Sequence, residues 1–178
     1  RQIEQLDGQV EGWVTGLQLI ALALQEAVSL PEAFSGSQRY LVDYLADQVL
    51  NRQPPEIQEF LLQTAVLNQF NASLCEQITG SPSQQLLEQI EAANLFLVPL
   101  DAERRWYRYH HLFGDFLNGR LQQQKSVEQI AHLHQQAACW YHEQNQPLVA
   151  VDHALAAGDY DLAIQLMEMV ARDVLMFG

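Results

Sequence analysis

The sequence predicts a mainly α-helical protein: a winged-helix domain with one β-hairpin, followed by a TPR-like antiparallel helical arm. Apolar residues recur at helical spacing along most of the 178 residues. Two short apolar and aromatic runs, residues 95–100 and 106–109, flank the charged turn 101–105, which is the pattern of a hairpin. Several helices precede the hairpin and one follows it, and this order is typical of a winged helix.

The sequence pattern before residue 54 predicts three helices and a linker. A first helix ends at Gly12, and residues 14–27 form a second helix that is apolar over most of its circumference. Residues 28–38 are rich in serine, proline and glycine, which indicates a linker. Residues 39–51 then form an amphipathic helix.

Two short helices are predicted next. Pro54 and Pro55 end the preceding helix and start the next one, because proline is tolerated only in the first turn. Asn71 is a suitable N-cap for the following helix, and Gly80 ends it.

Two more helices flank the hairpin. Ser81 or Ser83 starts the helix that runs to Asn94, and the hairpin occupies about residues 95–108. The helix after the hairpin begins at His110 and extends to about residue 124.

The pattern after residue 126 predicts paired helices. They span residues 127–144, 147–155 and 160–176, with the turn Ala157-Gly158-Asp159 between the last two. Small residues at close contacts and a Gly-Asp turn are typical of tetratricopeptide and other α-solenoid units. Three helices are too few to cover their own apolar faces, and we therefore expect further repeats after residue 178. The alternative is an ordinary apolar C-terminus. The chain also starts within a helical pattern and without Met, which indicates a piece of a longer protein.

The charge balance argues against direct nucleic-acid binding. The net charge is −13, and such an acidic protein repels nucleic acid unless it has a local basic face. In a winged helix the helix before the wing enters the major groove. Here that helix carries Glu88 and Glu91 and neither lysine nor arginine. A weak basic cluster surrounds the hairpin instead: Arg104, Arg105, Arg108, Arg120 and Lys125.

Several other chemistries lack their sequence patterns. Lys125 is the only lysine, so this chain contains no P-loop, whose lysine follows a glycine-rich loop. His132 and His134 are two residues apart and point to different helix faces, and no Cys-x-x-Cys is present. No nucleophile motif occurs either, so we expect neither a metal site nor an enzyme active site.

The remaining composition indicates a cytoplasmic protein. Cys75 and Cys139 both lie in apolar helical contexts and are expected to be buried, reduced thiols. The mean hydropathy is −0.13, and no apolar run is long enough for a membrane span or a signal peptide.

His110 is the strongest candidate for a functional residue. A histidine at a helix start, close to unpaired backbone N–H groups, is well placed to meet an anion such as a phosphate. The alternative is a structural histidine that packs under the hairpin.

Five motifs in one order resemble the MalT-like, LuxR-type transcriptional regulators, a branch of the STAND signal-transduction ATPases. They lie at residues 11–19, 44–50, 92–101, 106–113 and 150–159. The resemblance implies an ATP-dependent regulator in which residues 1–30 end a helical domain, 37–125 form the winged helix, and 126–178 start the arm or sensor.

The resemblance also implies a nucleotide contact. Tyr109-His110-His111-Leu112 is similar to the Met-His-Asp motif of related ATPases, whose histidine contacts the β-phosphate of ADP. His110 takes that position, and His111 stands where the aspartate is usual. Gly12-Trp13-Val14 corresponds to a Gly-x-Pro near the adenine, with valine in place of proline.

The implied partners lie outside this chain. They are an upstream P-loop ATPase domain that holds ATP or ADP, downstream sensor repeats, and a LuxR-type DNA-binding domain. The activated protein would self-associate, with residues 28–37 as the pivot. Two alternatives are a protein-interaction scaffold of a STAND protein with another effector, and a direct winged-helix DNA binder.

Overall fold

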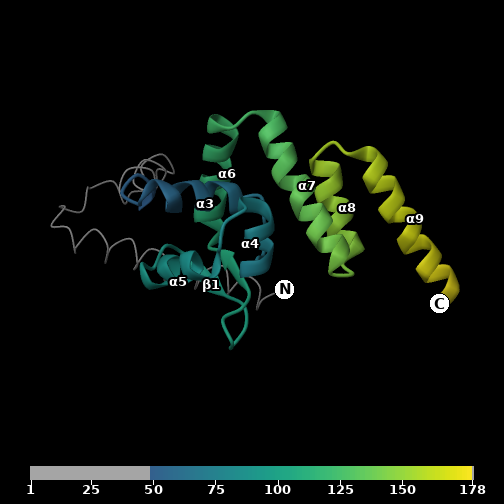
Figure 1. The fold of residues 1–178 in the computed structure, drawn as a ribbon, viewed down its shortest axis with the longest axis horizontal. Coiled ribbons are helices and arrows are strands. Elements are labelled where there is room, and N and C mark those ends of the chain that lie inside the picture. The colour runs from purple at the N-terminus through teal and green to yellow at the C-terminus, as the bar shows by residue number, and fades with distance from the viewer. Residues whose placement is uncertain (1–48, 178) are drawn as a thin grey trace, which may run out of the picture. The chain divides into compact units, whose positions relative to one another are not determined.

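In the first part of the described chain, several helices precede a short hairpin and one helix follows it. The structure is a computed structural model, and it describes residues 49–177, with side chains to residue 172. From Gln53 onward the chain forms one compact unit. Its winged-helix elements, in chain order, are α3 (Pro55–Thr64), α4 (Ala72–Thr79), α5 (Gln84–Ala92), β1 (Leu97–Pro99), β2 (Tyr107–Tyr109) and α6 (His111–Gln124) (Figure 1).

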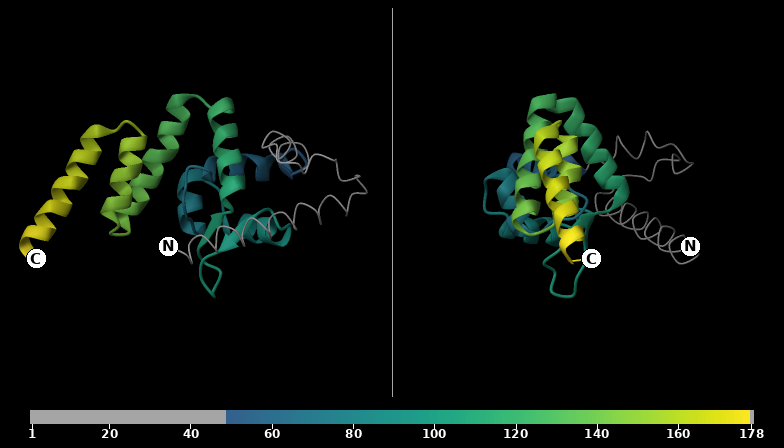
Figure 2. Two further views of the ribbon diagram at one scale, coloured as in Figure 1. Left: turned by 180° about the vertical axis from the view of Figure 1, so that it is seen from behind. Right: turned by 90° about the vertical axis from the view of Figure 1, so that its right-hand side faces the viewer.

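Three helices follow as an antiparallel arm. They are α7 (Val127–Glu143), α8 (Pro147–Ala156) and α9 (Tyr160–Phe177), and they lie side by side in sequence order (Figure 2). The predicted mainly α-helical fold, with a single hairpin and an antiparallel arm, is thereby confirmed for the described residues.

Local sequence signals set the helix ends. The side chain of Asn71 accepts a hydrogen bond from the Leu74 amide at 2.9 Å, which caps α4 as predicted. Gly80 ends α4 with a φ of 69°, a left-handed conformation that suits glycine. Ser126 and Gln129 form a reciprocal capping box at the start of α7.

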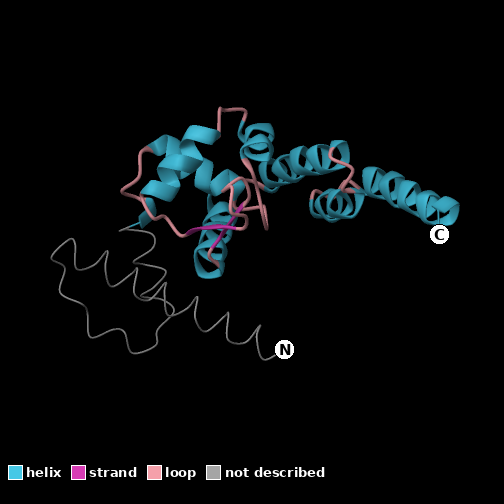
Figure 3. Cartoon of the chain, turned by 90° about the horizontal axis from the view of Figure 1, so that it is seen from below, coloured by secondary structure: helices cyan, strands magenta, loops and turns pink. Residues whose placement is uncertain are grey.

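The hairpin is short and is extended by a third segment. β1 and β2 are antiparallel, with Leu97 opposite Tyr109 and Pro99 opposite Tyr107 (Figure 3). Phe70, in the connection between α3 and α4, pairs with Tyr107 through two backbone hydrogen bonds of 2.8 Å. This pairing holds the start of β2 against the helices.

An aromatic cluster forms the core beneath the hairpin. The ring of Tyr109 lies 4.8 Å from that of Phe70 and 5.8 Å from that of Phe113, between ring centroids. The Tyr109 hydroxyl shares a buried hydrogen bond of 2.7 Å with the hydroxyl of Thr64. Burial raises the pKa of Tyr109 far above its usual range, so this hydroxyl stays protonated.

The first arm helix packs directly on the winged helix. The Trp140 indole N–H donates to Ser73 Oγ of α4 at 3.1 Å, and its ring meets Trp106 edge-on at 6.2 Å. The Tyr141 hydroxyl donates to the backbone carbonyl of Gln69 at 3.1 Å. Because these contacts reach both α4 and the wing, α7 and the winged helix form one packed body.

The two cysteines differ in environment. Cys75 is buried, as predicted, and burial raises the pKa of its thiol. Cys139 is exposed, so the expectation of a buried thiol was wrong there. α7 buries Leu133, Ala137 and Trp140 on one side, and Cys139 falls on the opposite side of the helix.

No helix in the described part of the chain combines the length and the apolarity that crossing a membrane requires.

A histidine pair joins α7 to α8. The Nδ1 atoms of His134 and His153 are 2.9 Å apart, so one ring donates and the other accepts. The His153 ring also stacks on Tyr141, with ring centroids 5.5 Å apart. Burial and the neighbouring His134 lower the pKa of His153 to about 4, against a partly offsetting effect of Asp152, and burial lowers the pKa of His134.

We therefore expect the chain to lose stability in acid. His153 is protonated less readily in the folded chain than in the unfolded one. Its contribution to the free energy of unfolding is therefore complete above about pH 6.5 and is lost as the pH drops towards 4. His153→Gln removes the titrating group, and the free energy of unfolding, measured by urea titration at pH 7 and pH 5, should then fall less. His132→Gln, at an exposed position of α7, is the matched control and should behave as the native chain does. An equal acid loss in all three proteins would contradict this prediction.

Candidate functional site

The structure places His110 at the base of the wing, between β2 and α6. It is the N-cap residue of α6, so the helix starts at His111, one residue after the predicted start. Its amide donates to the Phe96 carbonyl at 2.8 Å, and its carbonyl accepts from the Gly114 amide at 2.9 Å. The backbone of His110 is therefore fixed by the strand that enters the hairpin and by the helix that leaves it.

The side chain of His110 is buried. It is 4% exposed, and its ring lies 4.3 Å from the ring of the exposed His111, between centroids. This is the environment expected for the alternative role of His110, a structural histidine that packs under the hairpin. In this arrangement the His110 ring does not face solvent. A phosphate can therefore contact the ring only after the residues packed over the ring move aside.

The other predicted nucleotide-contact residues are Gly12, Trp13 and Val14. They lie outside the described residues, as does the predicted pivot 28–37. The predicted nucleotide site is therefore represented here by His110 alone.

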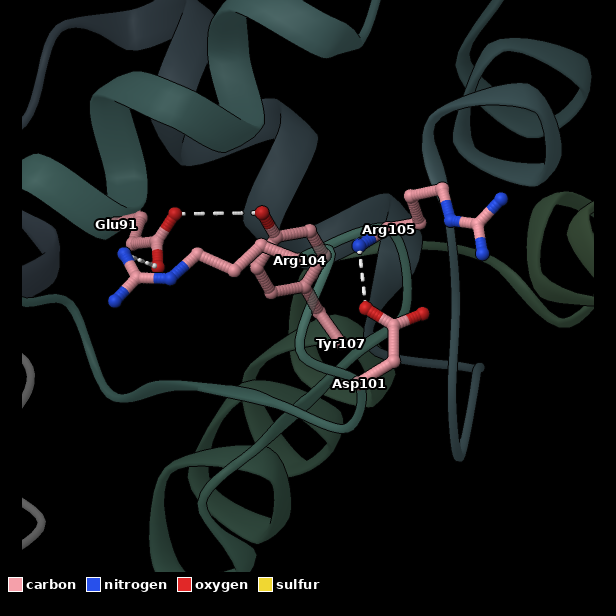
Figure 4. Close-up of polar contacts among 5 residues, drawn as sticks. All are labelled: Glu91, Asp101, Arg104, Arg105 and Tyr107. Carbon is pink, nitrogen blue, oxygen red and sulfur yellow. Dashed lines mark hydrogen bonds and ion pairs between the residues drawn. The ribbon is translucent and has the colours of Figure 1, made fainter.

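The wing tip is tied back to the helix before it. Arg104 pairs with Glu91 of α5 at 2.7 Å, and the Tyr107 hydroxyl donates to the same carboxylate at 3.3 Å (Figure 4). Asp101 accepts hydrogen bonds from the backbone amides of Arg105 and Trp106, at 2.7 and 3.2 Å, which shapes the turn. These contacts orient the turn of the wing toward α5.

This arrangement removes basic charge from the surface that a DNA-binding winged helix would use. Burial, and then the charge and hydrogen bond of Glu91, raise the pKa of Tyr107. Arg104 is engaged by Glu91, and Glu88 is also exposed on α5. Elsewhere in the predicted basic cluster, Lys125 pairs with Glu59 of α3 at 2.6 Å. Sequence reasoning identified these charges but missed their pairing, because the partners lie 13 and 66 residues apart.

Among the described residues, no three His, Cys, Asp or Glu side chains are placed to hold a metal ion. The paired histidines His134 and His153 use their facing nitrogens to bind each other.

The fold and the site define a winged-helix module whose helix before the wing is acidic and whose last helix is followed by an antiparallel helical arm. Residues 46–129 match the MalT winged helix domain family. The chain is thus a MalT-like segment that contains a winged-helix domain of the MalT family.

The relatives share most of this chain. It is 40% identical over 161 residues to the HTH-type transcriptional regulator MalT of Klebsiella pneumoniae subsp. pneumoniae, which covers 87% of this chain and 18% of that protein. The MalT of Cronobacter sakazakii is 39% identical over 164 residues, 89% of this chain and 18% of that protein. The serine/threonine-protein kinase PknK of Mycobacterium tuberculosis (strain H37Rv) is 35% identical over 170 residues, 93% of this chain and 15% of that protein. The chain therefore spans less than a fifth of the length of these relatives.

We expect the chain not to bind duplex DNA. At about 10 µM protein, within the range of non-specific protein–DNA affinities, a gel-shift experiment should show no salt-sensitive complex. The double variant Glu88→Lys and Glu91→Lys reverses both charges of α5 and should gain weak, salt-sensitive binding. A native complex that weakens with salt would contradict the prediction.

Proposed function

We propose that this chain is the nucleotide-state-sensing and interdomain switch segment of an ATP-dependent, MalT-type transcriptional regulator, and that it is not itself catalytic. The placement of His110 carries the proposal: it is the N-cap of the helix directly after the wing, in a winged helix of the MalT family. The acidic face of α5 supports it further, because the domain's own DNA-reading surface repels a phosphate backbone.

The chemistry of His110 suits a phosphate. An imidazole N–H can donate to a phosphate oxygen, and the N-terminal end of α6 adds a favourable dipole. The upstream P-loop domain would hold ADP, and His110 would clamp the resting state. Because the ring is buried here, the clamp would require that the residues over the ring move aside while the backbone hydrogen bonds of His110 stay in place.

The arm would carry the change onward. Trp140 and Tyr141 fasten α7 to α4 and to the wing, so a displacement of the winged helix moves the start of the arm with it. Nucleotide exchange and inducer binding would bias this two-state element and expose surfaces for self-association in the cytoplasm.

His110→Ala in the full regulator should weaken ADP retention and raise inducer-independent transcription. One lost hydrogen bond to a charged group is worth about 1.5–3 kcal/mol, so the ADP dissociation constant should rise by about tenfold or more. Fluorescent-ADP binding and a reporter assay measure both effects. His142→Ala, at an exposed position of α7, is the control. Unchanged ADP affinity together with unchanged basal activity would refute the role of His110.

Trp140→Ala should uncouple the arm from the winged helix. The residue is 6% exposed, and its loss should cost about 3 kcal/mol of the free energy of unfolding. In the full regulator, the variant should still bind ADP but respond less to inducer. Trp140→Phe keeps the ring packing without the Ser73 hydrogen bond and should lie between the two. A normal inducer response in Trp140→Ala would show that α7 does not transmit the change.

The similarity to a protein kinase favours a second candidate. The same segment could act as a switch and interaction scaffold in a STAND protein whose effector is not a LuxR-type domain, as the 35% identity to PknK suggests. Both candidates share the switch. The sequence on either side of this chain distinguishes them, since a Walker A lysine upstream and a LuxR-type helix-turn-helix downstream favour the transcriptional regulator.

A further inference from the structure

The backbone of Phe96 has a conformation that a bulky residue rarely adopts. Its φ is 56°, in the left-handed region, where the side chain of an L-residue crowds its own backbone. Phe96 is also only 3% exposed, so burial prevents its ring and backbone from moving into solvent to relieve the strain. Such strain persists only where the surrounding structure holds it.

Two contacts hold Phe96, and both lead to the segment of His110. The register that pairs Leu97 with Tyr109 makes Phe96 and His110 the next opposed residues, and the Phe96 carbonyl accepts the His110 amide at 2.8 Å. The Phe96 ring lies 5.2 Å from the ring of Phe113, in the first turn of α6. The strained residue and the candidate sensor therefore form the last pair of the wing, where both strands leave the ladder.

We propose that Phe96 is a positioning residue that sets the place of His110 through a strained backbone. The proposal rests on the sensing role of His110. While the His110–Phe96 hydrogen bond is intact, His110 stays at the base of the wing and Phe96 stays left-handed. Opening that bond lets Phe96 relax, so the strain favours release of His110 and lowers the cost of switching.

A pair of variants isolates the backbone contribution. Phe96→Ala and Phe96→Gly both lose the ring, but only glycine accepts a positive φ without strain. In the full regulator, amide exchange at His110, followed by mass spectrometry, should be about fivefold faster in Phe96→Ala than in Phe96→Gly. ADP release should be faster in Phe96→Ala by a similar factor. Equal exchange in the two variants would overturn the proposal.

The matched control is Asn94, which shares the left-handed backbone with a φ of 52° but is exposed and lies two residues before Phe96. Asn94→Ala and Asn94→Gly should show the same ADP release and the same exchange at His110. A difference in ADP release as large as that of the Phe96 pair would make the effect one of general loop strain and would overturn the proposal.

Phe96→Leu covers the case in which loss of the ring unfolds the wing. Leucine keeps apolar bulk and the strained backbone but loses the stacking on Phe113, so exchange at His110 should be faster than in the native protein. Native exchange in this variant would overturn the proposal.

Two outcomes separate the proposal from the function on which it rests. If exchange at His110 differs between the Ala and Gly variants but ADP release does not, while His110→Ala does release ADP, Phe96 has no positioning role and His110 remains the sensor. If His110→Ala retains ADP normally, the sensing role fails, and the proposal for Phe96 fails with it, whatever the exchange rates show.

Discussion

The position of the wing depends on the burial of Tyr109. This residue is 6% exposed and joins three elements at once, through Phe70 before α4, Phe113 on α6 and the Thr64 hydroxyl on α3. A buried hydroxyl needs a hydrogen-bond partner, and the one available to it here fixes the depth and the direction of the ring. Because β2 cannot shift without breaking this bond, the residue after Tyr109 starts α6 at a defined place.

That constraint explains why the base of the wing can bear strain. On one side of the hairpin, Tyr109 anchors β2 in the core, and on the other side Phe96 has to reach the ladder from the end of α5. The backbone turns through a left-handed residue to make that connection. The His110 amide then completes the ladder with the Phe96 carbonyl. The local strain at Phe96 is thus offset by the burial of aromatic rings and by one backbone hydrogen bond. A small displacement of α6 would change both the ring packing and the hydrogen bond.

The sequence predicted the elements well because their signals are local. Proline at the start of α3, the Asn71 cap and Gly80 each act within a few residues, and the structure confirms them. Exposure of Cys139 was missed, since the apolar spacing of α7 does not say how wide its buried face is. The pairing of Arg104 with Glu91 and the left-handed φ of Phe96 were missed too. The first joins residues that only the fold brings together, and the second has no residue-type signal because phenylalanine is an unusual choice there. The role of His110 stays a prediction.

The same contacts show how a DNA-reading fold can serve another purpose. In a DNA-binding winged helix, the recognition helix and the wing both turn their polar groups outward. Here the carboxylate of Glu91 pairs with the Arg104 guanidinium and accepts from the Tyr107 hydroxyl, so wing and helix contact each other. An exposed ion pair of this kind contributes little stability, so its consequence is mainly one of orientation. Trp106 of the wing meanwhile faces Trp140 of α7, so the wing contacts the arm as well as α5. The wing therefore makes its polar contacts with α5 and an aromatic contact with α7, and both contacts lie within the protein.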